Sequence, residues 1–507
     1  MIPMCLTTAA SLLVCSALAL GAPAQSKADP FDASVRRLRD AVTGHRDGRH
    51  LEILASLRSL KDPSLAPFFS RLTSSDDPLI QINGILGLAE TSPEHLIDPW
   101  LVSRLTTEAA RLQAINLAIG LELIDTAQMR TILAWENLQD TLQAALLAEL
   151  IARDEDVDPK VLERLAASEN QKVRAVAAML LTQTTGERAP FESFRAELEE
   201  LPADERHNAF MWLANDAGQY RLEHMLWWLE ELATASDADE PLAMLAIESA
   251  LLINPDAGAA LWQSHLARDP SHGQRVAHGL LLLDVAREVE IPPALFDEVR
   301  DGEELTEKIA DAGSALAMAR ESAAEPLLAL LALDHRRSAA DVAVGGKLLP
   351  PDQAALLYKA MIDRAMDGSA DSSVRPLRAE LAVRAVPLLF EISPDAVEEL
   401  LVAAPDDSQN QEMILIGLLG ATDSRAGETA RTVKRLGFGP ADSLALLLIA
   451  KHAPAGELRQ DELANLGMLA AGGGRLSPAL AAEAAWLYIK HTGKIELAMS
   501  RLFTPGE

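Results

Sequence analysis

Cysteine is nearly absent from this chain of 507 residues. The two cysteines, Cys5 and Cys15, both lie within the first 24 residues, so the rest of the chain contains no thiol. Disulfides, thiolate nucleophiles, zinc–cysteine sites and covalently attached c-type haem are therefore excluded from residues 25–507. The fold has to be held together by side-chain packing alone.

Charged side chains are also missing from the first 24 residues, MIPMCLTTAASLLVCSALALGAPA. An apolar centre from Ala10 to Leu20 is followed by Ala22-Pro23-Ala24, which is a small-x-small cleavage signal. We predict a cleaved signal peptide over residues 1–24 and one domain over residues 25–507, located in the periplasm or secreted. The missing Lys or Arg departs from the usual pattern, so an uncleaved anchor and a lipoprotein signal at Cys15 remain alternatives.

Aromatic residues make up only 4% of the chain, with just three tyrosines. Alanine and leucine dominate instead, and no window alternates apolar with polar residues, so the composition favours helices over strands. No apolar run after residue 24 is long enough to span a bilayer. The sequence therefore predicts an all-α protein without membrane insertion once the signal is removed.

Basic residues are too few to balance the acidic ones. The chain has 45 Lys and Arg against 75 Asp and Glu, which gives a formal net charge of −30. Such a surface repels phosphate backbones and anionic lipids, so we predict no binding to nucleic acid. It suits a basic protein or peptide partner, although solubility alone is the simpler reason for the same excess.

Helical hairpins are what the sequence does contain, and Leu51–Glu90 shows them most clearly. Asp62-Pro63 and Asp77-Pro78 each combine an N-cap oxygen with proline at the first helical position. The short turn between the two helices makes them antiparallel neighbours, and such a pair needs another pair on each side to bury both of its faces. The apolar residues that recur at helical spacing are Leu65, Phe68, Phe69 and Leu72, then Ile82, Ile85 and Leu86.

The same hairpin recurs along the chain every 33 residues or so, roughly the spacing of helical solenoid repeats. No long linker interrupts the series. We predict an all-α fold, an α-solenoid of about twelve stacked antiparallel helical hairpins. The second helices are expected to start near Asp77, Thr106, Gln139, Gln171, Ala203, Glu240, Ser271, Leu305, Ser338, Ser373, Ser408, Ala441 and Ser477.

Two stretches carry a more specific repeat pattern. Leu51–Glu90 and Asp158–Leu181 both have Asp-Pro before the first helix and a short polar turn, and Val173-Arg174 then opens the second helix, as Val374-Arg375 does further on. The chain in this respect resembles HEAT repeats, which implies a HEAT-like superhelix and specifies fold rather than function. Leu198–Gly218 departs from the pattern towards tetratricopeptide repeats, but their Trp, Leu-Gly and Tyr signature is not evident there.

Motifs for metal or phosphate chemistry are missing. The 11 histidines form no HExxH motif, and the His-Glu dipeptide of iron hydroxylases with a HEAT fold does not occur. No Walker loop, dinucleotide fingerprint or Gly-x-Ser-x-Gly elbow is present. His265, His272 and His278 fall across one predicted helix–turn–helix. They would converge on a metal only if those two helices form the predicted hairpin. We predict no cofactor, no metal and no catalytic residue.

The most unusual stretch is Arg206–Leu232, because it holds five of the chain's few aromatic residues. On a helix that starts at Tyr220, Trp228 borders the inward apolar stripe, whereas Trp227 shares its side with acidic residues and should be partly exposed. Tryptophan and tyrosine often supply binding hot spots. Packing between neighbouring repeats is the simpler role for Trp227. The candidate binding residues are Tyr220, Glu223, His224, Trp227, Glu230 and Glu231.

The sequence thus favours an exported, non-enzymatic scaffold or adaptor that binds protein or peptide partners through the solenoid surface. One alternative is a carbohydrate-active enzyme, a glycoside hydrolase or polysaccharide lyase built on a helical toroid. Such an enzyme needs two carboxylates across a cleft and aromatic platforms for sugar rings, for which three tyrosines are a poor supply. A structural spacer without a specific ligand is the second alternative.

Overall fold

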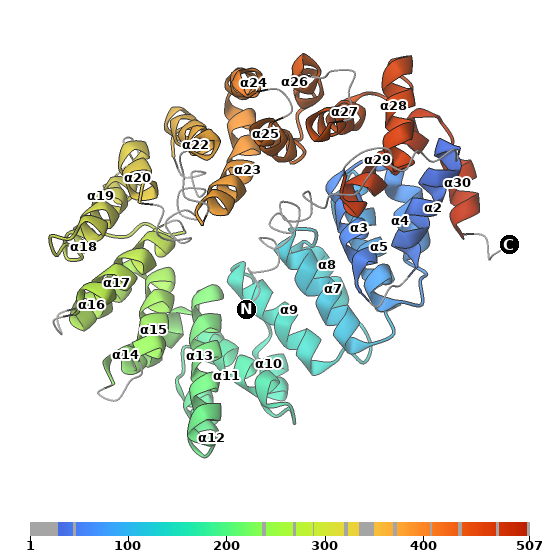
Figure 1. The fold of residues 1–507 in the computed structure, drawn as a ribbon. Coiled ribbons are helices and arrows are strands. Elements are labelled where there is room, and N and C mark those ends of the chain that lie inside the picture. The colour runs from blue at the N-terminus through green and yellow to red at the C-terminus, as the bar shows by residue number, and fades with distance from the viewer. Residues whose placement is uncertain are drawn as a thin grey trace. The chain divides into compact units, whose positions relative to one another are not determined.

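The computed structural model describes residues 29–43, 47–235, 240–266, 270–286, 288–318, 323–333, 349–368, 373–405, 408–433, 439–472 and 476–503. Over these residues the chain forms α-helices and two short 3-10 helices, and none of them belongs to a β-strand (Figure 1). The all-α prediction is therefore confirmed. Among the described helices, none combines the length and the apolar character that crossing a membrane requires. The predicted signal peptide lies outside the described residues.

The chain divides into two compact units. Unit 1 spans Met1–Asp125 and Tyr358–Glu507, and unit 2 spans Thr126–Leu357. The helices of unit 1 are α2 (Pro30–Val42), α3 (Arg49–Ser59), η1 (Pro63–Leu65), α4 (Ala66–Leu72), α5 (Pro78–Thr91), α6 (Pro99–Ser103), α7 (Glu108–Gly120), α23 (Arg375–Ile392), α24 (Pro394–Ala403), α25 (Gln409–Leu418), α26 (Arg425–Val433), α27 (Pro440–His452), α28 (Gln460–Ala470), α29 (Pro478–His491) and α30 (Ile495–Phe503).

Unit 2 is built in the same way. Its helices are α8 (Thr126–Leu133), α9 (Asp140–Ala152), α10 (Pro159–Ala166), α11 (Gln171–Thr185), α12 (Ala189–Glu199), α13 (Ala203–Gln219), η2 (Glu223–Met225), α14 (Leu226–Thr234), α15 (Glu240–Ile253), α16 (Pro255–Leu266), α17 (His272–Val285), α18 (Ala294–Asp297), α19 (Glu304–Met318) and α20 (Ala324–Leu331). The remaining helix, α22 (Pro351–Met366), contains the boundary between the two units.

The predicted starts of the second helices agree closely with these bounds. Every predicted start that falls on described residues lies within two residues of the first residue of a helix, from α5 near Asp77 to α29 near Ser477. The predicted start at Ser338 lies outside the described residues. Capping explains part of this accuracy, because a side chain that accepts an amide hydrogen bond fixes a helix start locally. Such caps are present at α5, α7, α11, α17, α25 and α29.

The second helices also form the continuous inner row of each stack. In unit 2, helices α9, α11, α13, α15, α17 and α19 each pack against the next one in the series. In unit 1 the same holds from α23 through α25 and α27 to α29, and from α3 through α5 to α7. The first helices cover them as antiparallel partners, as in the pairs α4–α5, α10–α11 and α26–α27. The prediction of stacked antiparallel hairpins is therefore confirmed.

The α4–α5 hairpin illustrates how the repeat holds together. All seven residues of its two predicted apolar stripes are buried, with at most 2% of their surface exposed. The helices approach closely because α5 offers glycine where α4 offers an aromatic ring: a Cβ atom on Gly87 would lie 2.5 Å from the ring of Phe69. Small residues at this contact therefore set the distance between the two helices.

The N-cap of α5 gives a first testable prediction. The Asp77 carboxylate accepts hydrogen bonds from the amides of Leu79 and Ile80, at 2.9 and 3.4 Å. Replacing Asp77 with alanine removes the oxygen that accepts both hydrogen bonds, so we expect the free energy of unfolding to fall by about 1 kcal/mol in urea titrations. The neighbouring Asp76 is exposed, and Asp76→Ala serves as the matched control. Equal effects of the two substitutions would show that the cap contributes nothing.

Within unit 1, the first and last helices of the described chain pack against each other. Helix α29 contacts α2 and α3, and α30 contacts α2 and α4. Lys490 on α29 lies 2.8 Å from Asp62, and the indole of Trp486 donates a hydrogen bond of 3.1 Å to the hydroxyl of Ser64. A helical stack normally needs polar caps on its end faces. In unit 1, the two ends of the chain cover each other instead.

Candidate functional site

The aromatic segment that the sequence singles out is not one helix from Tyr220, and that prediction is wrong. Helix α13 ends at Gln219, and α14 starts only at Leu226, after the short η2. Arg221 adopts a left-handed conformation with a φ of 49°, and Leu222 donates its amide back to the carbonyl of Ala217 at 3.0 Å. This C-terminal cap ends α13, so Tyr220 and Trp227 do not lie on a common helix.

Trp227 is half-buried at the contact between α12 and α14. Its ring meets Phe191 edge-on at 6.3 Å, and the guanidinium of Arg188 lies 4.7 Å from its centroid. Trp228 is fully buried between Phe191 and Phe210, at centroid distances of 4.9 and 5.9 Å, as the sequence predicted. One face of the Trp227 ring therefore already holds a cation from its own chain.

The acidic residues around Trp227 lie at the surface, and one of them is paired. Glu223, Glu230 and Glu231 are exposed, and Glu231 forms an ion pair with Arg195 of α12. The exposed Glu230 leaves its carboxylate available to solvent on the same helix. Helix α12 thus brings Arg188 to the tryptophan and Arg195 to the glutamate, which sequence spacing within α14 could not reveal.

Tyr220 and His224 have other surroundings. Tyr220 is half-buried at the C-terminus of α13, and its burial together with the charges of Asp216 and Glu149 raises the pKa of its hydroxyl. His224 is exposed, and its backbone amide donates to the side chain of Gln183 at 3.0 Å. The six candidate residues therefore form no single cluster. Trp227 and Glu231 face α12, whereas the neighbours of Tyr220 lie elsewhere.

Helix α24 presents an acidic face that the sequence prediction missed. Asp395, Glu398, Glu399 and Val402 recur at the spacing of one helical face and line a groove of about 460 Å³ together with Ala403. Val402 is 61% exposed, although it is a large apolar side chain. The opposite face of α24 buries Val397, Leu400 and Leu401. The sequence contains a sign of this surface, because an apolar residue, Val402, lies on the same helical face as the acidic residues.

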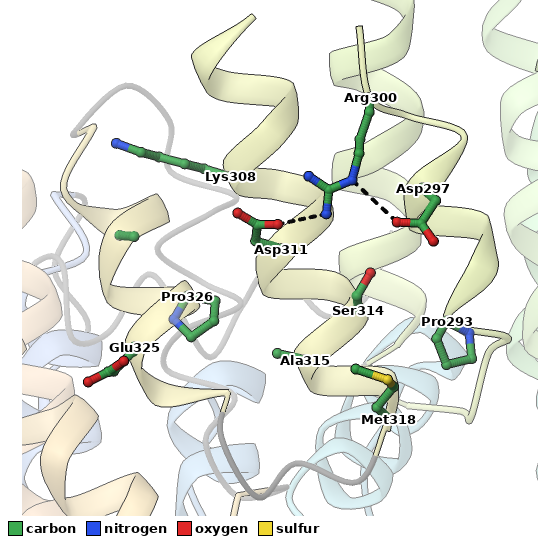
Figure 2. Close-up of a pocket in the computed structure, with 11 residues that line it drawn as sticks. Pro293, Asp297, Arg300, Lys308, Asp311, Ser314, Ala315, Met318, Glu325 and Pro326 are labelled. Atoms are coloured by element: carbon green, nitrogen blue, oxygen red, sulfur yellow. Dashed lines mark hydrogen bonds and ion pairs between the residues drawn. The ribbon is translucent and has the colours of Figure 1, made fainter. Parts of the chain in front are cut away.

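A second cavity, of about 700 Å³, lies between α18, α19 and α20 (Figure 2). Figure 2 shows Arg300 at its edge, paired with Asp297 at 3.3 Å and with Asp311 at 2.6 Å. The hydrogen bonds that the guanidinium donates to these carboxylates raise its pKa, and Lys308 is paired with Glu304 at 2.7 Å. Because its cations are already neutralised, this cavity offers little attraction to an anionic ligand.

The histidine hairpin folds so that two of its three histidines meet. The rings of His265 and His278 lie 5.3 Å apart, and Glu240 approaches His265 at 3.4 Å. His272 does not join them, because it pairs with Asp301 at 2.7 Å. The sequence pointed to both histidines but not to Glu240, which is 25 residues away from His265 in the chain. A buried histidine pair with a carboxylate is a set of side chains suited to metal binding.

Glu248 on α15 is one of several carboxyl groups whose raised pKa bears on an enzymatic role. Its burial, together with the charges of Asp284 and Glu288, raises its pKa to about 6. Raised carboxyl pKa values of this kind are used by general acids. Glu248 lines neither of the two cavities described above.

Comparison with known proteins adds little to this description. No protein-family model matches the chain, and no curated protein matches it at a significant level. Among solved structures, the chain is similar to the crystal structure of a mutant of Kap121p, with 13% sequence identity and a TM-score of 0.26. The similarity covers 94% of this chain and 55% of that chain, so this chain spans about half the length of its match. A TM-score this low carries no information on function.

Proposed function

We propose that the chain is an exported, non-enzymatic scaffold with a HEAT-like superhelix, which binds basic protein or peptide partners in the periplasm or outside the cell. The observation that carries this proposal is the acidic face of α24, where Val402 is 61% exposed within a groove of carboxylates. An exposed apolar side chain next to carboxylates suits an amphipathic helix with basic flanks, because its apolar stripe covers Val402 while its cations meet the acidic residues.

The charge of the whole chain supports the same class of partner. A formal net charge of −30 attracts a basic partner over a distance and speeds the first encounter, and salt weakens that attraction. The short-range contact then decides which basic partner stays bound. The groove on α24 supplies such a contact, because Asp395, Glu398 and Glu399 all line it.

The surface around Trp227 is the second candidate contact in this proposal. Arg188 lies over the ring at 4.7 Å, and Arg195 pairs with Glu231. A partner with lysine or arginine side chains would replace these internal cations with its own, and the tryptophan would gain contact area with the partner. We therefore expect binding to weaken when Trp227, Glu230 or Glu231 is replaced. The effect should be smaller than that of replacing the acidic residues on α24.

The test is a binding measurement with a defined probe on residues 25–507. Binding of a lysine-rich amphipathic helical peptide is measured by fluorescence anisotropy. A scrambled peptide of equal charge serves as the comparison. We expect the double substitution Glu398→Gln/Glu399→Gln to weaken binding of the amphipathic peptide about five- to tenfold, since each exposed ion pair contributes modestly. Trp227→Ala is measured in parallel.

Matched controls separate this site from the general charge of the chain. Glu163 and Glu169 are exposed glutamates of unit 2, and Glu163→Gln/Glu169→Gln removes the same charge far from α24 in the sequence. We expect that variant to bind like the unchanged protein. If both double variants weaken binding equally, or if the scrambled peptide binds equally well, the groove on α24 is not a recognition site.

A further inference from the structure

We propose that Glu240, His265 and His278 form a binding site for a divalent transition metal ion, with zinc(II) as the preferred ion. The three residues come from three successive helices: Glu240 is the first residue of α15, His265 lies in the last turn of α16, and His278 lies within α17. The inference is independent of the proposed partner binding, which rests on other residues.

The geometry already gathers one ligand atom from each of the three side chains. These atoms all lie within 4.8 Å of one another, and the Nε2 atom of His265 lies 3.4 Å from the Oε1 atom of Glu240. A hydrogen bond of 3.4 Å is long compared with the usual value of about 2.9 Å. A metal ion held between these atoms would replace that weak contact with two coordinate bonds.

Both histidines of the site are buried. His265 is 7% exposed and His278 is 1% exposed, and the Nδ1 atom of each is buried without a hydrogen-bond partner among the described residues. A buried polar atom without a partner is unfavourable, because folding removes its hydrogen bonds to water and supplies none in return. In such a site His265 would bind the ion through Nε2, which already faces Glu240, and the unpaired Nδ1 atom of His278 is available as a further ligand atom.

The surroundings suit a metal that prefers nitrogen ligands. Trp262 is fully buried and meets the ring of His278 edge-on at 5.7 Å, so one side of the site is apolar. Glu240 is exposed and leaves the site open towards solvent.

The donor set selects among metal ions. Two imidazoles and one carboxylate match zinc, which takes four ligands and accepts water as the fourth, whereas magnesium and calcium prefer oxygen ligands alone. Because the ligands lie on three helices, the bound ion would tie the start of α15 to α16 and α17. The site would therefore act first as a clip for this part of unit 2.

The test uses the full chain, freed of metal with a chelator. Isothermal titration with ZnCl₂ is carried out in a large excess of Mg²⁺, which occupies carboxylate sites but competes poorly for imidazole. Cobalt(II) replaces zinc in a second experiment, where visible absorption reports tetrahedral nitrogen and oxygen ligation. The variants are Glu240→Gln, His265→Gln and His278→Gln, and His272→Gln is the matched control, because its side chain pairs with Asp301 instead.

We expect one zinc ion per chain, and affinity at least about tenfold lower in Glu240→Gln and His265→Gln than in the unchanged protein or in His272→Gln. Saturating zinc should raise the melting temperature of the unchanged protein by roughly 5 °C and raise that of Glu240→Gln clearly less. Because Glu240 is exposed, its variant should stay folded even if the buried His278→Gln does not. Absence of saturable zinc binding, or equal affinities in Glu240→Gln, His265→Gln and His272→Gln, would overturn the proposal.

Discussion

Replacing Trp486 with alanine is expected to lower the free energy of unfolding of unit 1 by about 3–5 kcal/mol, because large aromatic side chains leave a cavity when they are removed from a core. Trp486 is fully buried on α29, and its ring packs against Phe68 of α4 at a centroid distance of 5.9 Å. The substitution also leaves the hydroxyl of Ser64 without its indole partner. Urea unfolding followed by circular dichroism measures the loss.

The size of the effect follows from the position of α29 between the two ends of the chain. Trp486 and Ser64 are 422 residues apart in sequence, and α29 packs against α2, α3, α27 and α28. Buried residues lie on nearly every side of α29, so it is a core helix and not an end cap. Removing its largest side chain therefore weakens the contacts by which the first and last helices of unit 1 cover each other.

Trp100 provides the matched control for this prediction. It belongs to α6 in unit 1 but is 60% exposed, with the guanidinium of Arg104 at 4.9 Å. We expect Trp100→Ala to change the free energy of unfolding by no more than about 0.5 kcal/mol. Comparable losses for the two substitutions would mean that the contact between the chain ends contributes little to stability.

Replacing Glu483 with glutamine is expected to stabilise the protein at alkaline pH by about 3 kcal/mol. Glu483 is buried on α29, where its carboxyl group accepts a hydrogen bond from the hydroxyl of Ser56 on α3. Burial raises the pKa of this carboxyl from 4.5 to about 7, although Ser56 and the charge of Lys451 act in the opposite direction. Glutamine keeps the shape and the polar partner but never has to be charged inside the core.

The sign of the pH dependence follows from the two pKa values. Between pH 4.5 and about 7, the folded chain holds a proton on Glu483 that the unfolded chain releases. The free energy of unfolding therefore falls as the pH rises through this window and stays low above it. We expect urea unfolding curves of the Glu483→Gln variant to match those of the unchanged protein near pH 4 and to exceed them at pH 8.

An exposed glutamate of the same region serves as the control for this second prediction. Glu457 precedes α28 in sequence and is exposed. We expect Glu457→Gln to shift the stability curve by a small amount that does not depend on pH. If Glu483→Gln lowers stability at pH 8 as much as at pH 4, the carboxylate is paired more favourably than its burial implies, and the prediction fails.

The start of several second helices could be predicted from single residues. Asp77, Asn170, Ser271 and Ser477 each accept an amide hydrogen bond at the N-terminus of a second helix, and each had marked a predicted start or lies next to one. Such caps act within three residues of themselves, so they need no tertiary context. The same locality explains why Trp228 was correctly assigned to the core and why α24 presents three acidic residues on one helical face.

The candidate sites depended on contacts between segments that no local pattern connects. Arg188 and Arg195 reach Trp227 and Glu231 from the preceding hairpin, and Glu240 reaches His265 from another helix. The break after Tyr220 was missed because a left-handed arginine at position 221 carries no sequence signature, unlike a glycine. Candidate binding residues predicted from one helical face were therefore incomplete.

The sequence by itself determined that this chain is helical, where most helices begin and which side of each is apolar, because these properties arise from hydrogen bonds and side-chain spacing within a few residues. Only the tertiary structure decided that α29 packs against α2 and α3, that Glu483 is buried beside Ser56, and that Glu240 meets two histidines. Those contacts join residues from 25 to more than 400 positions apart, and their energies depend on burial that exists only after the hairpins have stacked.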